Sequence, residues 1–310
     1  MADIVYFDGE FVPAETARIP IQAHVVNYGT GCFEGIRAYW NAEHEELYAT
    51  LLRGHVDRLL RSARILKLDF DGEPEHISGI LLELLSRNGY RQDAYLRPLV
   101  YKSGHTIKVA LTGIATSFAA YTIPMGAYLD IGKGLSVTFS AWRRIEDNAI
   151  PARAKVIGSY VNAAMASDEA RQLGFDEALM LTSDGHVAEA SSSNLFVVLD
   201  GELVTPEPGD DILVGITRNA LIELARHLGL QLRERKVDRS EVLGADEVFL
   251  CGTGVQVAPV TSVDGRAIGA GKPGPLTLAI QERYLAAVRG ETTEFAHWRT
   301  PVYGGAGKGR

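Results

Sequence analysis

This chain is organised around one segment, which begins I-P-A-R-A-K-V-I-G-S-Y at residues 150–160. It continues as E-A-S-S-S-N-L-F at 189–196 and ends as L-V-G-I-T-R at 213–218. Lys155 stands among small and apolar neighbours, where an amine is poorly hydrated and can attack an aldehyde as a nucleophile. A lone lysine in such a setting is more often a surface residue. Lys155 alone therefore does not predict a nucleophile, and the prediction depends on the two later blocks.

The later blocks can supply an acid and an anion site. Glu189 offers a carboxylate, although a lone glutamate before serines is usually a solvated loop residue. Gly215 precedes a helix predicted at 217–228, and the N–H groups and positive dipole end of such a helix suit a phosphate. An amine, an acid and a phosphate cradle in one segment are what pyridoxal 5'-phosphate requires of a protein.

The acid and anion blocks, with L-V-T at 203–205 between them, resemble the signature of the class IV (fold type IV) aminotransferases. Further blocks resemble the branched-chain amino acid aminotransferases of that class: N-Y-G-T-G-C-F-E-G-I-R at 27–37, H-V-D-R-L at 55–59, A-Y-L-R-P-L at 94–99 and G-T-G at 252–254. The resemblance covers nearly the whole chain. It implies transamination of L-leucine, L-isoleucine and L-valine with 2-oxoglutarate, which gives branched-chain 2-oxo acids and L-glutamate.

The resemblance also implies roles for single residues, with pyridoxal 5'-phosphate as the cofactor and no metal. Lys155 is implied to hold the cofactor covalently and to move the proton. Glu189 is implied to face the ring nitrogen, and Tyr160 to bond the phenolic oxygen. The implied phosphate ligands are Arg58, the amides of Ile216 and Thr217, and Thr253. A guanidinium, a helix start and a hydroxyl are each chemically suited to a phosphate.

For the substrate, the resemblance implies that Tyr95 and the turn Thr253-Gly254 hold the α-carboxylate, and that Arg97 meets the side-chain carboxylate of glutamate. Arg97 also sits between apolar residues of a predicted strand at 94–101, so it must be paired or must await an anion. The full predicted rim is Tyr28, Phe33, Tyr95, Arg97, Ile107, Val109, Met125, Tyr128 and Gly254.

Two departures alter the expected pocket, because Met125 stands where a bacterial relative often carries Trp and Lys108 where a small residue is common. The loop at 104–109 is implied to belong to the neighbouring subunit's site. A homodimer or higher homo-oligomer with a composite active site is therefore expected.

The predicted elements mix without a βαβ rhythm, which favours an α+β fold. Helices are predicted at 53–67, 75–87, 159–173, 217–228 and 274–289. Asp8-Gly9 predicts a type I' hairpin turn, the glycine-rich run at 24–40 predicts strands with close backbone approach, and Pro98 predicts an edge or irregular strand. The resemblance implies a small N-terminal α/β domain and a larger C-terminal pseudobarrel domain with the cofactor between them. The expected bounds are 1–124 and 137–302, with a linker at 125–136 and a flexible, glycine-rich tail at 303–310.

Composition excludes several classes of partner. With 46% hydrophobic and 23% charged residues, the chain of 310 residues reads as globular, with a sizeable core. The net charge of -8, with no basic run longer than Arg143-Arg144, argues against nucleic acid. No apolar run approaches the ~20 residues of a membrane span. Cys32 and Cys251 form no C-x-x-C motif, and the start of the chain has no basic signal region, so a cytoplasmic location is expected.

Three alternatives stay open beside the branched-chain assignment. One is a D-amino acid or (R)-amine transaminase on the same fold. Another is a class IV lyase such as the one that releases 4-aminobenzoate. A protein that binds the cofactor without turnover is the third, and it is disfavoured because Lys155, Glu189 and Tyr160 are all present.

Overall fold

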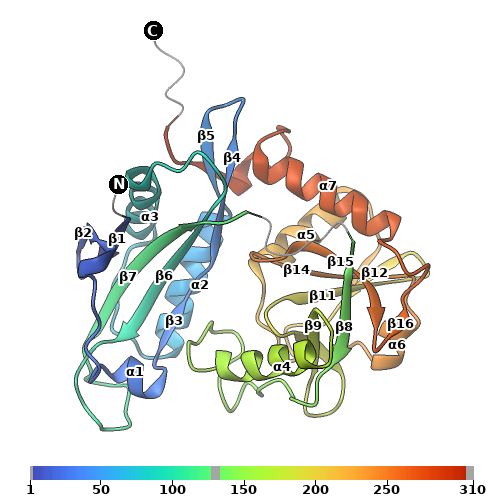
Figure 1. The fold of residues 1–310 in the computed structure, drawn as a ribbon, viewed down its shortest axis with the longest axis horizontal. Helices are drawn as coiled ribbons and strands as arrows, with labels where there is room; N and C mark the ends of the chain where they lie inside the picture. Colours follow the sequence, from blue (N-terminus) through green and yellow to red (C-terminus); the bar gives the residue numbers. More distant parts are fainter. Residues whose placement is uncertain (1–2, 127–132, 305–310) are drawn as a thin grey trace. The chain divides into compact units, whose positions relative to one another are not determined.

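A computed structural model describes residues 3–126 and 133–304 (Figure 1). Packing divides the chain into two compact units. Unit 1 comprises Met1–Gly126, Ala154–Gly158 and Ala286–Arg310, and unit 2 comprises Ala127–Arg153 and Ser159–Leu285. The five residues around Lys155 thus pack with unit 1, although the chain on both sides of them belongs to unit 2.

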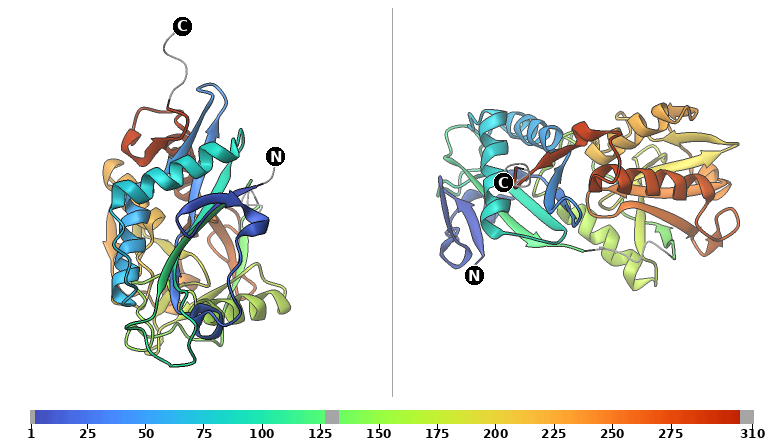
Figure 2. Two further views of the ribbon diagram at one scale, coloured as in Figure 1. Left: turned by 90° about the vertical axis from the view of Figure 1, so that its left-hand side faces the viewer. Right: turned by 90° about the horizontal axis from the view of Figure 1, so that it is seen from above.

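Unit 1 is built on an eight-stranded antiparallel sheet in the order β17-β5-β4-β6-β7-β1-β2, with β3 also paired to β6. Helices α2 (Leu52–Ile65) and α3 (Pro74–Asn88) lie on one face of this sheet (Figure 2). Their apolar sides pack on the strands to form the unit's core. The strands are β1 (Ile4–Phe7), β2 (Glu10–Pro13), β3 (Gly31–Phe33), β4 (Ile36–Asn41), β5 (Glu46–Thr50), β6 (Ala94–Lys102), β7 (Thr116–Pro124) and β17 (Arg299–Pro301).

Pro98 does not mark an edge strand, because β6 pairs with other strands on both sides, but the pairing of β6 is irregular beside it. Proline is accepted there for a local reason. On one side of β6 the pairing partner changes from β4, at Leu96, to β3, at Leu99. Pro98 falls between these two pairings, where a missing N–H removes no ladder hydrogen bond to either strand.

The run at 24–40 begins with a helix, α1 (His24–Tyr28), where strands were predicted. Gly29 ends α1 in the left-handed conformation, with φ of 64°, and donates its N–H to the Val25 carbonyl at 2.8 Å. A Cβ at Gly29 would lie 2.7 Å from Cα of Gly158. The glycine-rich run therefore does allow the predicted close backbone approach, and the segment it approaches is the one that carries Lys155.

Unit 2 holds a nine-stranded mixed sheet in the order β10-β9-β8-β15-β14-β11-β12-β13, with β16 paired to β15. The strands are β8 (Leu135–Phe139), β9 (Glu177–Leu181), β10 (Val187–Ala190), β11 (Asn194–Leu199), β12 (Glu202–Thr205), β13 (Leu232–Glu234), β14 (Glu247–Gly252), β15 (Gln256–Val263) and β16 (Arg266–Ala267). Only three residues join β10 to β11, and Ala190 donates its N–H to Ser193 at 2.8 Å. Since four strands separate β10 from β11 in the order, the sheet must curl back on itself.

The helices of unit 2 pack around this curled sheet (Figure 1). They are α4 (Tyr160–Gln172), α5 (Ile216–His227), α6 (Arg239–Leu243) and α7 (Pro275–Arg289), and α7 passes into unit 1 at Ala286. Short 3₁₀ turns occur at Ala14–Thr16 and Ala296–Trp298. The five longer predicted helices are all confirmed. Of the predicted tail, Tyr303 is held by its hydroxyl, which donates to the Tyr90 carbonyl at 2.7 Å, and 305–310 lie outside the described residues.

Across the described part of the chain, no helix combines the length and apolar character that crossing a membrane demands.

Candidate active site

The Lys155 segment is attached to β3 by backbone hydrogen bonds. Phe33 donates its N–H to the Lys155 carbonyl at 3.1 Å, and Cys32 and Val156 form an antiparallel bridge. The Lys155 N–H donates to Oγ of Ser62 at 3.2 Å. Its Nζ lies 5.1 Å from the centre of the Phe33 ring, within the range of a cation–π contact. Both ends of the lysine are therefore positioned by the same strand.

Helix α2 presents a polar stripe on its buried face. His55, Arg58 and Ser62 are spaced three and four residues apart, so they share one side of the helix. All three are buried, and of the three the sequence analysis singled out only Arg58. The charged members of this stripe must therefore have partners inside unit 1.

Glu34, in the loop after β3, is that partner. Nε of Arg58 donates to Oε1 of Glu34 at 2.6 Å, and Nη2 donates to Oε2 at 2.9 Å. Nδ1 of His55 lies 2.7 Å from the same Oε2. Burial alone would raise the pKa of Glu34, but the Arg58 charge and the hydrogen bonds from Arg58 and His55 outweigh it and hold that pKa well below its usual range.

Tyr95 and Arg97 meet on the same face of β6. Nη2 of Arg97 donates to the Tyr95 hydroxyl at 2.6 Å, and the Arg97 guanidinium lies 4.4 Å from the centre of the Phe33 ring. A Cβ at Gly35 would lie 2.1 Å from the Tyr95 hydroxyl, so only glycine leaves room for it. The Phe33 ring is thus contacted by two cations, Arg97 and Lys155, which the sequence reasoning assigned to different tasks.

The predicted loop residues lie together but face solvent. The Tyr28 hydroxyl donates to the Ile107 carbonyl at 2.9 Å, which ties α1 to this loop. The side chains of Ile107 and Val109 are 91% and 82% exposed. Met125 uses its carbonyl to accept a hydrogen bond from Arg37 at 2.6 Å. Tyr128 lies outside the described residues.

In unit 2, Glu189 is a buried carboxylate surrounded by donors. Nη2 of Arg144 lies 2.8 Å from its Oε1, and Nδ2 of Asn194 donates to its Oε2 at 2.9 Å. The Leu213 N–H reaches both oxygens at 3.3 Å. Each of these donors favours the charged form of the carboxylate. An anion held in this way is suited to pair with a protonated ring nitrogen.

The same network fixes the start of α5. Nε of Arg144 donates to the Asp211 carbonyl at 3.2 Å, and Asn194 also donates to the Leu213 carbonyl at 2.9 Å. A Cβ at Gly215 would lie 2.0 Å from Oδ1 of Asn194, so the chain needs glycine as it enters the helix. The N–H groups of the first turn, which include those of Ile216 and Thr217, have no acceptor within the helix. Free N–H groups at a helix start are suited to an anion, so the prediction that Ile216 and Thr217 bind a phosphate stays a prediction.

The other predicted residues of unit 2 lie at the start of a helix and in a turn between two strands. Tyr160 is the first residue of α4, and Thr253 and Gly254 form the turn between β14 and β15. Sequence reasoning missed Glu34, His55 and Arg144, which contact the predicted site residues or their partners. Glu34 and His55 were visible as polar, ionisable positions within the quoted blocks, whereas Arg144 gave no local signal.

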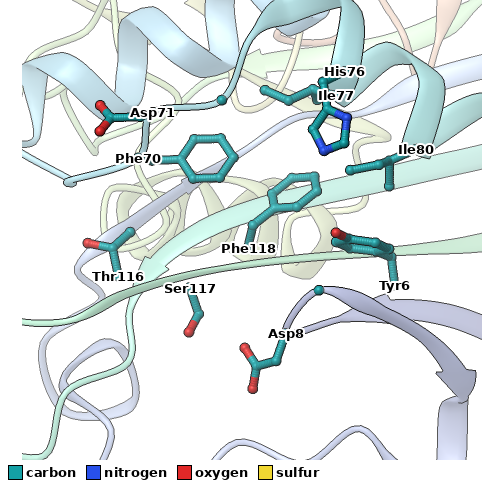
Figure 3. A pocket seen from close by; sticks show the side chains of 12 residues that line it. Tyr6, Asp8, Phe70, Asp71, His76, Ile77, Ile80, Thr116, Ser117 and Phe118 are labelled. Atoms are coloured by element: carbon teal, nitrogen blue, oxygen red, sulfur yellow. The ribbon is translucent and has the colours of Figure 1, made fainter.

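The cavity shown in Figure 3 lies elsewhere, in unit 1, beside β1, β7 and the start of α3, and has a volume of about 450 Å³. Its wall is aromatic, because Phe70 and Phe118 stack at 5.3 Å and Tyr6 lies 5.6 Å from Phe118. None of the residues that line it is a predicted site residue. It supplies no amine or guanidinium for the chemistry described above.

The family model for amino-transferase class IV matches residues 31–263. This chain belongs to the class IV aminotransferases. The matched segment runs from β3 to β15 and includes the predicted site residues Lys155 and Glu189. The predicted family and fold are thereby confirmed.

Individual relatives of this class IV aminotransferase extend the match to nearly the full chain. The probable branched-chain-amino-acid aminotransferase of Aquifex aeolicus is 44% identical over 97% of each chain. The branched-chain-amino-acid aminotransferase of Salmonella typhimurium is 36% identical over 97% of this chain and 98% of its own. The solved branched-chain aminotransferase of Thermoproteus uzoniensis with norvaline has a TM-score of 0.94 at 41% identity and covers 98% of this chain and 100% of its own. The solved holo-form of the branched-chain amino acid aminotransferase from Thermobaculum terrenum has a TM-score of 0.93 at 35% identity and covers 97% of this chain and 98% of its own.

Proposed function

We propose that this class IV aminotransferase transfers the amino group of L-leucine, L-isoleucine and L-valine to 2-oxoglutarate, which gives branched-chain 2-oxo acids and L-glutamate. The observation that carries the proposal is the Phe33 ring, with Nζ of Lys155 5.1 Å and the Arg97 guanidinium 4.4 Å from its centre. An aromatic face suits a branched aliphatic side chain, and a guanidinium suits the second carboxylate of glutamate. The near full-length similarity to branched-chain aminotransferases supports the same substrates.

The cofactor is pyridoxal 5'-phosphate, which draws electrons from the substrate Cα when it is bound. We assign its aldehyde to Lys155, its ring nitrogen to Glu189 and its phenolic oxygen to Tyr160. The residues fit these tasks, because the Glu189 carboxylate is buried among donors and the first turn of α5 offers N–H groups without helical acceptors. The assigned phosphate ligands are Arg58, Ile216, Thr217 and Thr253.

Lys155 and Tyr95 act on the substrate in this proposal. The Lys155 amine carries the proton to and from the substrate Cα, since its backbone is fixed by Phe33 and Ser62 and only its flexible side chain has to move. The Tyr95 hydroxyl and the amides of Thr253 and Gly254 hold the α-carboxylate. Arg97, aligned by Tyr95, holds the second carboxylate when the substrate is glutamate.

A homodimer, at least, completes the site. Ile107 and Val109 are large apolar side chains left almost fully exposed, which is unusual unless another surface covers them. Tyr28 holds their loop in place. We propose that a second copy of the chain receives this loop and that the loop supplies part of the apolar wall of the partner's substrate site. The cytoplasmic location, and domain bounds at 1–124 and 137–302, stay predictions from the sequence.

A panel of amino donors with 2-oxoglutarate tests the proposed substrates. L-leucine, L-isoleucine and L-valine should each yield L-glutamate far faster than D-alanine or an (R)-amine. The panel also distinguishes the proposed function from the main alternative, because a D-amino acid or (R)-amine transaminase would convert D-alanine or the (R)-amine faster than the L-amino acids. D-alanine outrunning L-leucine at equal concentration is the result that overturns the substrate assignment.

A further inference from the structure

Glu34 and His55 form a buried charged cluster with Arg58 that the proposed chemistry leaves unexplained. We propose that Glu34 is a positioning residue: it fixes the Arg58 guanidinium so that Arg58 can bind the cofactor's phosphate, and His55 in turn fixes Glu34. The inference rests on the proposed function, because the phosphate role of Arg58 is part of that function.

The geometry of the Glu34–Arg58 pair fixes the guanidinium. Glu34 receives Nε and Nη2 of Arg58 on its two oxygens, at 2.6 and 2.9 Å, which is the side-on arrangement that fixes both the place and the plane of a guanidinium. Of the five N–H donors of the guanidinium, Glu34 accepts hydrogen bonds from two. Without such a clamp, an arginine side chain keeps several rotamers and would have to be ordered by the phosphate itself.

Glu34 and Arg58 also balance each other's buried charge. Glu34 has no exposed surface, and Arg58 is only 4% exposed, so neither charge can be balanced by solvent. A buried cation that loses the anion to which it is hydrogen-bonded is strongly unfavourable. Glu34 is therefore the counter-ion that keeps Arg58 charged and in place before the phosphate arrives.

His55 completes the clamp from the other side of Glu34. Nδ1 of His55 lies 2.7 Å from Oε2 of Glu34. Burial lowers the pKa of His55, and the nearby positive charges of Arg58 and Lys155 lower it further, while Glu34 opposes them. The neutral ring then carries its proton on Nδ1 and donates it to Glu34. The groups that face one another here are Glu34, Arg58 and Lys155, with His55 neutral among them.

The test compares pyridoxal 5'-phosphate with pyridoxal, which has the same ring and aldehyde but no phosphate. Dissociation constants for both are measured on the apoprotein by visible absorbance. Because Glu34 acts through a phosphate ligand, Glu34→Gln should weaken binding of the phosphorylated form by about tenfold or more, the usual effect of losing a charge-assisted hydrogen bond. Pyridoxal binding should stay within about twofold of the wild type.

A matched control and a double variant make the comparison decisive. Glu75→Gln removes the same charge from an ion pair with Arg53 on the surface of unit 1, where Glu75 is 73% exposed, and should leave both constants unchanged. The double variant Glu34→Gln with Arg58→Gln removes both buried charges, so it avoids the unpaired cation that could prevent the single variant from folding. If Glu34 acts only through Arg58, the double variant should discriminate between the two compounds as poorly as Arg58→Gln alone.

The outcomes separate this inference from the proposed function. Equal loss of affinity for both compounds in Glu34→Gln would show a merely structural role and overturn the inference. So would a double variant that loses more discrimination than Arg58→Gln. If Arg58→Gln loses the preference for phosphate and Glu34→Gln retains it, Glu34 has no positioning role and the proposed function stands. If the wild type itself binds pyridoxal as tightly as the phosphorylated form, the phosphate role of Arg58 fails and the inference fails with it.

Discussion

Arg144 places Nη2 2.8 Å from Oε1 of Glu189, and both side chains are largely shielded from solvent. The same guanidinium donates through Nε to the Asp211 carbonyl, in the loop that leads into α5. One arginine therefore links the carboxylate assigned to the ring nitrogen with the loop that leads to the proposed phosphate ligands of α5. This arrangement keeps Glu189 charged and fixed in direction.

Replacing Glu189 with Gln should remove most of the activity and leave the fold intact, since the two side chains have nearly the same shape. The amide cannot pair as an anion with a protonated ring nitrogen, so kcat should fall on the order of 100-fold or more. Steady-state kinetics with L-leucine and 2-oxoglutarate measure the effect, with circular dichroism as the check on folding. A kcat within twofold of the wild type would mean that Glu189 does not face the ring.

Arg97→Ala should affect the two half-reactions unequally. L-glutamate brings a second carboxylate to the guanidinium that Tyr95 aligns, whereas L-leucine brings none. We expect the glutamate half-reaction to slow by about 10- to 100-fold, the range for losing a hydrogen bond to a charged group, and the leucine half-reaction to slow much less. Stopped-flow absorbance resolves the two rates. Equal losses would remove Arg97 from the role of recognising glutamate.

Ile107→Asp should weaken association of subunits without weakening the single chain. The side chain is 91% exposed within one subunit, so a charge there costs little until a partner covers it. Sedimentation velocity should show a shift toward monomer, and activity should fall with it. Leu173→Asp, at an exposed leucine of unit 2, is the matched control and should keep the assembly state. An unchanged sedimentation coefficient and full activity in Ile107→Asp would exclude this loop from a shared site.

His55→Gln should change how stability depends on pH. Burial holds the pKa of His55 below its ordinary value of 6.5, so between that value and the lower folded one the unfolded chain binds a proton that the native chain does not. Stability therefore falls as the pH drops below about 6.5. Urea midpoints measured from pH 7.5 to 5 should decline less steeply in His55→Gln than in the wild type. Parallel curves would contradict a neutral, buried His55.

Local patterns predicted the elements well. Asp8 and Gly9 both adopt positive φ, as the predicted hairpin turn requires, and Gly89 and Gly174 end their helices with positive φ. The predictions failed where residues distant in the sequence determine the local structure. Pro98 lies in a central strand because two different strands share one side of β6, which no local pattern reveals.

The candidate site divides in the same way. Lys155, Glu189 and the start of α5 were predicted because each belongs to a continuous motif with recognisable chemistry. The partners of the predicted residues Arg58 and Glu189 were not predicted, since Glu34 meets Arg58 across 24 residues and Glu189 meets Leu213 across the same separation. Such pairings depend on tertiary packing, and a single sequence without contact information gives no sign of which charged residues will be brought together.

The most direct test of the account is to trap the cofactor on the protein. Borohydride reduction of the purified holoenzyme fixes pyridoxal 5'-phosphate onto the lysine that carries it, and peptide mass mapping then locates the label. We expect the label on Lys155, and we expect a Lys155→Ala variant to bind the cofactor without being labelled and without transferring amino groups. A label on any other lysine, or transamination by Lys155→Ala at the wild-type rate, would contradict it.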